Sequence, residues 1–346
     1  MYEAFYGLRE RPFDLSPNPR FLFLSGGHRA ALTHLKYGLT GRPGLTVLVG
    51  DAGTGKTTLV MAALRALNGH EPSRIVHVSN PTLTRPEFYE YISVGFGFTR
   101  GAAASKVQFL RELADGIDAA AKEGQVIALV VDEAQSLPHE LLEEIRLLTN
   151  LEAAGGRTLA VALVGQPELA ERLNDASLRQ LKQRIALRCA LSPLDLRETA
   201  AYIAARVRVA GGSAELLFTR DAVRTVHEYS GGIPRTISVI CDNALVNGFA
   251  VDTRPVGHDL VLEVCRDFQL GRVSVTHADA PSPSTRAPAA GPAGVSKPPA
   301  TPGTPATPAP PAVPWNPPDA TAGPAPKRQG LFSSFGKRRR FSFFEG

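Results

Sequence analysis

The sequence contains the segment Gly50-Asp-Ala-Gly-Thr-Gly-Lys-Thr-Thr58, which lies between the apolar run Leu45–Val49 and a helical pattern. It fits the spacing G-x-x-x-x-G-K-[ST], in which glycines let backbone amides fold around phosphate groups and a helix N-terminus adds a favourable dipole. We expect the Lys56 amine to reach the β- and γ-phosphates and the Thr57 hydroxyl to hold magnesium. The predicted phosphate-binding residues are Gly50, Asp51, Ala52, Gly53, Thr54, Gly55, Lys56, Thr57 and Thr58.

A second acidic element follows another apolar run. Val126–Val131 ends directly in Asp132-Glu133-Ala-Gln135. Such an arrangement makes sense if the end of this strand lies beside the phosphate loop. Asp132 would then hold the magnesium ion, directly or through water, and Glu133 would orient and activate the attacking water. The alternative is a pair of acids at a helix N-terminus, where acidic side chains are favoured.

The rest of the first 270 residues alternates between apolar runs and helical patterns. Five short runs rich in Val, Ile and Leu are typical of a parallel sheet covered on both faces. These predicted strands are Leu45–Val49, Arg74–Ser79, Val126–Val131, Leu159–Val164 and Ile185–Leu191. The predicted helices between them include Thr57–Leu67, Ser105–Lys122 and His139–Leu151, and the pattern indicates an α/β fold.

The strand signal disappears from about Asp195. Residues 195–208, 219–229, 234–249 and 256–268 then have helical patterns. We therefore predict an α/β nucleotide-binding domain over residues 1–192, including the N-terminal segment, and a small all-helical lid domain over residues 193–270.

The last 76 of the 346 residues differ in composition. Residues 271–346 carry nine Lys/Arg and three Asp/Glu, whereas the whole chain carries 38 and 33, so the remainder is close to neutral. Residues 281–326 hold 16 of the 28 prolines and predict a disordered linker. The end of the chain places Lys337-Arg-Arg-Arg340 among phenylalanines. This pattern suggests a peptide that binds an anionic membrane surface or docks on a partner protein. The alternative is a disordered end that only keeps the chain in solution. Nucleic acid is a less favoured partner.

Cysteine usage and the N-terminus indicate the compartment. The three cysteines, Cys189, Cys241 and Cys265, have no paired spacing, so neither a zinc site nor a disulfide framework is predicted. The first residues contain no signal-peptide pattern, and no run of about 18 apolar residues predicts a membrane span. We expect a cytoplasmic protein, with the basic tail as a means of attachment at the inner membrane.

These motifs together resemble the AAA+ ATPases, and more narrowly the ExeA/GspA-like secretion ATPases. The more discriminating stretches are Tyr2-Glu-Ala-Phe-Tyr-Gly-Leu8, Pro12–Leu24, Val164-Gly-Gln-Pro-Glu-Leu169 and Gly231-Gly-Ile-Pro-Arg235. The resemblance covers about residues 1–268. It implies a P-loop sheet in the order 5-1-4-3-2, a helical lid, and magnesium-dependent ATP hydrolysis. It also implies a role as a switch or motor in assembling an envelope secretion, pilus or exopolysaccharide export system.

The resemblance also assigns polar residues around the nucleotide. Gln166 follows the fourth strand, where AAA+ proteins keep a polar residue near the γ-phosphate. Arg235 matches the lid arginine that reaches the nucleotide, with a solvated helix-start arginine as the alternative. Asn80 follows the second strand, where it could hold Glu133 inactive or simply form a turn before a proline.

Arginine fingers of AAA+ proteins come from the region just before the fifth strand. Arg179 and Arg184 lie there, and Arg184 is the favoured candidate to act on the ATP of a neighbouring subunit. Self-association is therefore expected. Both residues also fit the alternative of surface arginines on a charged helix.

Three further residues have mainly structural interpretations. His28 is interpreted as a polar residue at a helix start. Phe21 and Phe23 are interpreted as core residues, with packing near the adenine as the alternative. A second function class, a DNA-associated AAA+ regulator of the transposition-helper or origin-recognition type, is disfavoured by the near-neutral charge of the first 270 residues.

Overall fold

The computed structural model describes residues 1–16, 18–40, 44–68, 73–79, 81–151 and 158–273. All of them lie in one compact unit of the chain, residues 1–280. The predictions for Asn80 and for the tail beyond residue 273 lie outside the described residues.

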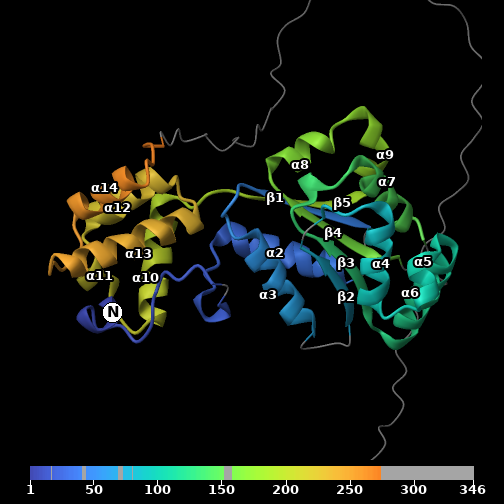
Figure 1. Cartoon of the computed structure of the whole chain (residues 1–346), viewed down its shortest axis with the longest axis horizontal. Helices are drawn as coiled ribbons and strands as arrows, with labels where there is room; N and C mark the ends of the chain where they lie inside the picture. Colours follow the sequence, from blue (N-terminus) through green and yellow to red (C-terminus); the bar gives the residue numbers. More distant parts are fainter. Residues whose placement is uncertain (17, 41–43, 69–72, 80, 152–157, 274–346) are drawn as a thin grey trace, which may run out of the picture. The chain divides into compact units, whose positions relative to one another are not determined.

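A five-stranded parallel sheet forms the centre of the α/β part (Figure 1). Its strands are β1 (Leu45–Gly50), β2 (Ser73–Val78), β3 (Val126–Val131), β4 (Ala160–Gly165) and β5 (Ile185–Leu191). Their order is β2-β3-β4-β1-β5, which confirms the order implied by the resemblance. Because all pairs are parallel, the carboxyl ends of β1, β3 and β4 meet at one edge of the sheet, where the phosphate loop and the acidic pair begin.

The prediction that all five strands are covered on both faces is wrong for two of them. Every residue of β1, β3 and β4 is buried, whereas most residues of β2 and β5 are half-buried or exposed and the buried ones lie in the second half of each strand. The reason is their place in the sheet, since β2 pairs only with β3 and β5 only with β1 within the described part of the chain. The sequences of the strands differ in the same way, because β2 contains Arg74 and His77 and β5 contains Arg188, whereas β1, β3 and β4 contain no ionisable residue.

Helices cover both faces of the sheet. Successive residues of β1 point to opposite faces: Val47 packs in the cluster that contains Phe88, and Leu48 in the cluster that contains Leu59. On the first face lie α4 (Arg85–Phe96), α6 (Lys106–Glu123) and α7 (His139–Leu148); on the second lie α2 (Gly26–Leu39) and α3 (Lys56–Asn68). The shorter α5 (Arg100–Ala104), α8 (Pro167–Arg172) and α9 (Arg179–Gln183) complete this part.

Most predicted helices appear within two residues of their expected ends. The exception is the helix expected over His139–Leu151, which ends at Leu148 with Thr149 as its C-cap. Leu151 packs against the core after the helix has ended, so an apolar residue extended the sequence pattern beyond the true boundary. Within the described ranges no helix is long and apolar enough to cross a membrane.

A second core is formed by the helices that follow β5. They are α10 (Leu196–Val209), α11 (Ala214–Leu217), α12 (Arg220–Ser230), α13 (Pro234–Ala250) and α14 (His258–Asp267), of which α11 was not predicted. The N-terminal segment, with α1 (Tyr2–Phe5), adds Tyr2, Phe13 and Phe21 to this core, although the sequence analysis grouped it with the α/β domain. The division of the chain at residues 192/193 remains a prediction.

The turn between α12 and α13 depends on Gly232. Its φ is +75°, and a Cβ atom there would lie 2.0 Å from the carbonyl oxygen of Leu194. The same two residues are joined by a backbone hydrogen bond of 2.8 Å from the Leu194 amide to the Gly232 oxygen. This close approach connects the start of α10 to the start of α13.

We expect Gly232→Ala to destabilise the protein by about 2–5 kcal/mol, because left-handed strain and a backbone clash add together. Urea unfolding of the full chain measures the loss. Gly124→Ala is the matched control, since Gly124 has a φ of +70° but no neighbouring atom within 4 Å. It should lose only about 1–2 kcal/mol. Equal losses in the two variants would contradict the clash.

Candidate nucleotide-binding site

The predicted phosphate loop lies between β1, which ends at Gly50, and α3, which begins at Lys56. Gly53 and Gly55 have φ values of +83° and +97°, which turn successive backbone amides toward one side of the loop. The Thr54 hydroxyl donates a hydrogen bond of 2.8 Å to the carbonyl oxygen of Asp51 and closes the turn. The loop therefore has the form of an anion-binding nest at a helix N-terminus.

The Lys56 side chain is buried beneath this loop. Its Nζ donates to the carbonyl oxygens of Gly50 at 2.8 Å and Asp51 at 3.0 Å. Burial lowers the pKa of Lys56 below its ordinary value, while the carboxylates of Glu133 and Asp132 act in the opposite direction. The cation is thus fixed at the loop and near two acids.

Thr57 and Asp132 meet as the sequence predicted. The Thr57 hydroxyl donates to Oδ2 of Asp132 at 2.6 Å, and Oδ1 of Asp132 accepts the backbone amide of Glu133 at 2.9 Å. These hard oxygen donors fit magnesium, which commonly takes one or two protein ligands beside substrate phosphates. Within the described residues, no group of three or more His, Cys, Asp or Glu side chains forms a separate metal site.

Glu133 has a left-handed backbone, with φ 51° and ψ 36°. Its Oε2 accepts hydrogen bonds from the side-chain amides of Gln135 at 2.6 Å and Gln166 at 3.2 Å. Burial raises the pKa of Glu133, but these two hydrogen bonds and the charge of Lys56 outweigh it and hold the pKa below its ordinary value. The side chain is therefore kept as a carboxylate.

A cavity of about 540 Å³ lies over the loop, within the 300–1,000 Å³ range typical of small-molecule sites. It brings together most of the residues predicted from the sequence, together with residues of the N-terminal segment and of α10 and α13. The predicted residues that line it are Ala52, Gly53, Gly55, Lys56, Thr57, Thr58, Glu133, Gln166 and Arg235. Gly50, Asp51, Thr54 and Asp132 support these residues through the contacts described above.

The helical part reaches the cavity at the start of α13. The backbone amide of Arg235 donates to the carbonyl oxygen of Gly53 at 3.2 Å. A Cβ at Gly53 would lie 2.9 Å from side-chain atoms of both Arg235 and Ile233, so glycine permits this approach. Gly53 is not a fixed position of the G-x-x-x-x-G-K-[ST] pattern, so no motif predicts this second role of the residue.

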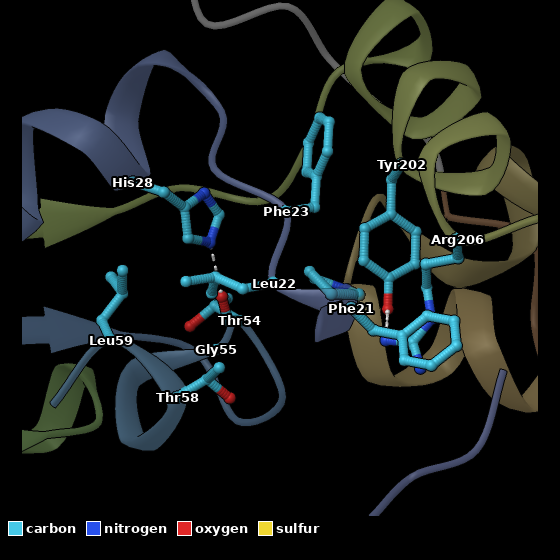
Figure 2. Close-up of a pocket in the computed structure, with 11 residues that line it drawn as sticks. Phe21, Leu22, Phe23, His28, Thr54, Gly55, Thr58, Leu59, Tyr202 and Arg206 are labelled. Carbon is cyan, nitrogen blue, oxygen red and sulfur yellow. Dashed lines mark hydrogen bonds between the residues drawn. The ribbon is translucent and has the colours of Figure 1, made fainter. Parts of the chain in front are cut away.

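His28 also contacts the loop, which the sequence analysis did not predict (Figure 2). The residue lies in the first turn of α2, as expected, and its backbone amide donates to the N-cap side chain of Ser25. In addition, its Nε2 lies 2.9 Å from the carbonyl oxygen of Thr54, and its Nδ1 lies 2.8 Å from the Ser25 hydroxyl. Since a carbonyl only accepts, Nε2 carries the proton and donates to the loop.

Phe21 and Phe23 lie where the loop, α2 and α10 approach one another (Figure 2). Phe21 is buried in the second core, and the Arg206 guanidinium lies 5.0 Å from the centre of its ring. The ring of Phe23 packs edge-on against Tyr202 at 5.7 Å. The core interpretation therefore holds for Phe21, whereas Phe23 is half-buried and packs against the core. Both side chains line a smaller cavity of about 80 Å³ beside the loop.

Arg206 was not assigned from the sequence either. It donates hydrogen bonds to the carbonyl oxygens of Pro12 and Asp14, the latter at 2.8 Å, and to the Tyr202 hydroxyl at 3.1 Å. These contacts join α10 to a segment more than 190 residues earlier in the chain. Only the folded structure could identify such a pairing.

The two candidate arginine fingers lie away from this cavity. Arg179 is the first residue of α9 and Arg184 is its C-cap, and both side chains are exposed. Neither lines the cavity, and neither side chain forms a hydrogen bond or ion pair with another described residue. They are therefore free to meet another molecule.

Comparison with known proteins gives matches of two kinds. The family model "AAA domain" matches residues 39–173. General secretion pathway protein A of Aeromonas hydrophila is 41% identical over 258 residues, which are 75% of this chain and 47% of that protein. The chain therefore spans about half the length of this relative.

Solved structures show the same fold at low identity. The Aeropyrum pernix ORC2 protein in its ADPNP–ADP complexes is 17% identical with a TM-score of 0.54, covering 75% of this chain and 71% of that one. Drosophila ORC bound to DNA is 18% identical with a TM-score of 0.56, covering 75% and 65%. Cdc6p from Pyrobaculum aerophilum is 16% identical with a TM-score of 0.56, covering 74% and 70%. At these identities the likeness concerns the fold alone.

The family match identifies residues 39–173 as an AAA domain, and the sheet order and the phosphate loop agree with a P-loop fold. More narrowly, the chain is a relative of General secretion pathway protein A, which confirms the resemblance drawn from its sequence.

Proposed function

We propose that this chain binds ATP with magnesium in the 540 Å³ cavity and hydrolyses it. The observation that carries this proposal is the meeting of four groups at one end of the sheet. The Thr57 hydroxyl bonds the buried Asp132 carboxylate at 2.6 Å, and Glu133 lines the same cavity as Lys56. A phosphate-binding lysine, an oxygen pair for magnesium and an ionised carboxylate are the parts that phosphoryl transfer to water requires.

Each residue has a defined task in this proposal. The loop amides and Lys56 hold the phosphates, and Thr57 and Asp132 hold the metal. Magnesium bound there neutralises charge on the phosphate oxygens. The Glu133 carboxylate orients the attacking water and accepts its proton.

Two residues extend the site beyond the loop and the acidic pair. Gln166 lines the cavity and bonds Glu133 at 3.2 Å, which supports its role as a polar residue near the γ-phosphate. Arg235 is exposed, lines the cavity and is connected through its backbone to the phosphate loop, which supports a contact with the nucleotide from the lid.

The assembly around the ATPase is also a proposal. Arg184 and Arg179 are exposed, and their side chains have no partner among the described residues, which supports self-association in which one of them completes the site of a neighbouring subunit. The 41% identity to General secretion pathway protein A supports a task in an envelope export system. A place at the cytoplasmic side of the inner membrane rests on the sequence alone. Attachment to anionic lipid through Lys337–Arg340 rests on the sequence alone. The fold likeness to ORC does not support DNA as a partner, because it concerns the fold only.

Loss of the Lys56 cation should abolish nucleotide binding. Lys56→Ala removes a buried charge that faces the phosphates, and truncating one partner of such a pair costs about 2–5 kcal/mol or more, at least about 30-fold in affinity. Titration with a fluorescent ATP analogue in the presence of magnesium measures the effect. Lys122→Ala, which removes an exposed lysine from the last turn of α6, is the control. Equal affinity of the Lys56→Ala variant and the wild type would contradict the assignment of the site.

A further inference from the structure

Gln135 links the two side chains that the proposed hydrolysis depends on. It lies in a 3-10 turn directly after the acidic pair, over Ala134–Ser136. Its Nε2 donates to Oε2 of Glu133 at 2.6 Å, and its Oε1 accepts the backbone amide of Gln166 at 3.0 Å. The sequence analysis gave this residue no role.

The orientation of the Gln135 amide is fixed by its neighbours. The backbone N–H of Gln166 can only donate, so the atom that faces it is the oxygen. The nitrogen must then face the Glu133 carboxylate, which can only accept when ionised. A reversed amide would place two donors together on one side and two acceptors on the other.

The surroundings provide space and support for this one side chain. A Cβ at Gly165 would lie 2.7 Å from Oε1 of Gln135, so glycine at the end of β4 leaves the room that the amide occupies. Arg172, on α8, donates a hydrogen bond to the main-chain oxygen of Gln135. The glycine thus leaves room for the Gln135 side chain, and Arg172 connects the main chain of the turn to α8.

We propose that Gln135 is a positioning residue for hydrolysis. Its side chain holds Oε2 of Glu133 and connects the Glu133 carboxylate to the Gln166 backbone, so that the other carboxylate oxygen, Oε1 of Glu133, is presented to the attacking water. This inference rests on the proposed ATPase function. Within the described residues, both hydrogen bonds to the Glu133 carboxylate end on Oε2, and none reaches Oε1. A carboxylate with two rotatable bonds beyond its Cβ gains a defined direction from such an anchor, and a misplacement of about 1 Å can lower a rate about 10²-fold.

Gln135→Met is the main test, because it keeps the length of the side chain and removes both of its polar atoms. We expect kcat for ATP in the full chain to fall about 10²-fold, while the affinity for a fluorescent ATP analogue stays within about twofold. Gln108→Met is the matched control. It removes an amide that bonds Thr99 and Glu112, none of which lines the cavity, and it should leave both quantities unchanged.

A second variant, Gln135→Glu, distinguishes the contact of residue 135 with the Glu133 carboxylate from its contact with the Gln166 backbone. It keeps an oxygen for the Gln166 amide but loses the donor to Glu133 and places a second negative charge beside it. We expect kcat to fall at least as far as in Gln135→Met. Turnover close to that of the wild type would overturn the proposal, because it would mean that only the backbone contact matters.

A comparison with Glu133→Gln keeps the two proposals distinguishable. If Glu133→Gln turns over like the wild type, the base assignment fails and the reason for an anchor fails with it. If Glu133→Gln is inactive and Gln135→Met turns over like the wild type, the anchor alone is overturned. In the Glu133→Gln background, Gln135→Met should cause no further loss, because the carboxylate it positions is gone.

A crystal structure of Gln135→Met provides a readout that does not depend on turnover. The Glu133 carboxylate should move away from the position in which it accepts a hydrogen bond from the side-chain amide of Gln166. An unchanged Glu133 side chain in this variant would overturn the proposal.

Discussion

Replacing Glu133 with glutamine is expected to stop ATP turnover while ATP binding persists. The substitution keeps the shape of the side chain but removes the carboxylate that would accept a proton from water. Loss of a general base lowers rates by about 10²–10⁴-fold. The measurement is single-turnover hydrolysis beside a binding titration, at a nucleotide concentration that saturates both proteins.

The control for this prediction is Glu263→Gln. Glu263 is exposed on α14 and does not line the cavity, so the same loss of charge there should change neither binding nor rate. A Glu133→Gln protein that hydrolyses ATP at the wild-type rate would show that another group activates the water.

Replacing Arg184 with alanine is expected to cause the second large effect. Arg184 is exposed and lies outside the cavity of its own chain, so any action on ATP has to occur in a neighbouring subunit. Arginine fingers supplied in this way contribute about 10³–10⁵-fold to the rate, and we expect a loss in that range with ATP binding unchanged. Turnover per subunit in the wild type should rise with protein concentration, because the finger arrives by association.

Arg179→Ala and Arg266→Ala complete this experiment. Arg179, five residues before Arg184, is the other candidate finger, and its loss should have the smaller effect. Arg266 is exposed in the last turn of α14 and does not line the cavity, so its removal should have none. Specific activity that does not depend on protein concentration would contradict a site completed in trans.

The parts of the site that the sequence predicted are those carried by short, contiguous patterns. Residues 50–58 hold a complete phosphate loop, and an apolar run that stops at Asp132 predicts a strand ending at an acid. The carboxyl ends of parallel strands lie at the same edge of a sheet, so the two patterns together place Thr57 and Asp132 at that edge. Their contact at 2.6 Å also depends on the strand order, in which only β4 lies between β1 and β3. The strand order came from the resemblance, since no residue pattern specifies which strands are neighbours.

The parts that the sequence did not predict depend on partners far apart in the chain. His28 reaches a loop carbonyl 26 residues away, and Arg206 bonds backbone oxygens near the N-terminus. A lone histidine or arginine on a helix has many ordinary explanations, and only the fold selects one of them. Burial of β2 and β5 was overestimated for a different reason, because their Val, Ile and Leu residues were given more weight than Arg74, His77 and Arg188.

A crystal structure of the Glu133→Gln protein with ATP and magnesium would show whether the loop and the acidic pair form the nucleotide site. We expect the triphosphate over residues 50–58 with the γ-phosphate beside Lys56, and the metal next to Thr57 and Asp132. Nucleotide bound away from this loop, or a metal held by other residues, would contradict it.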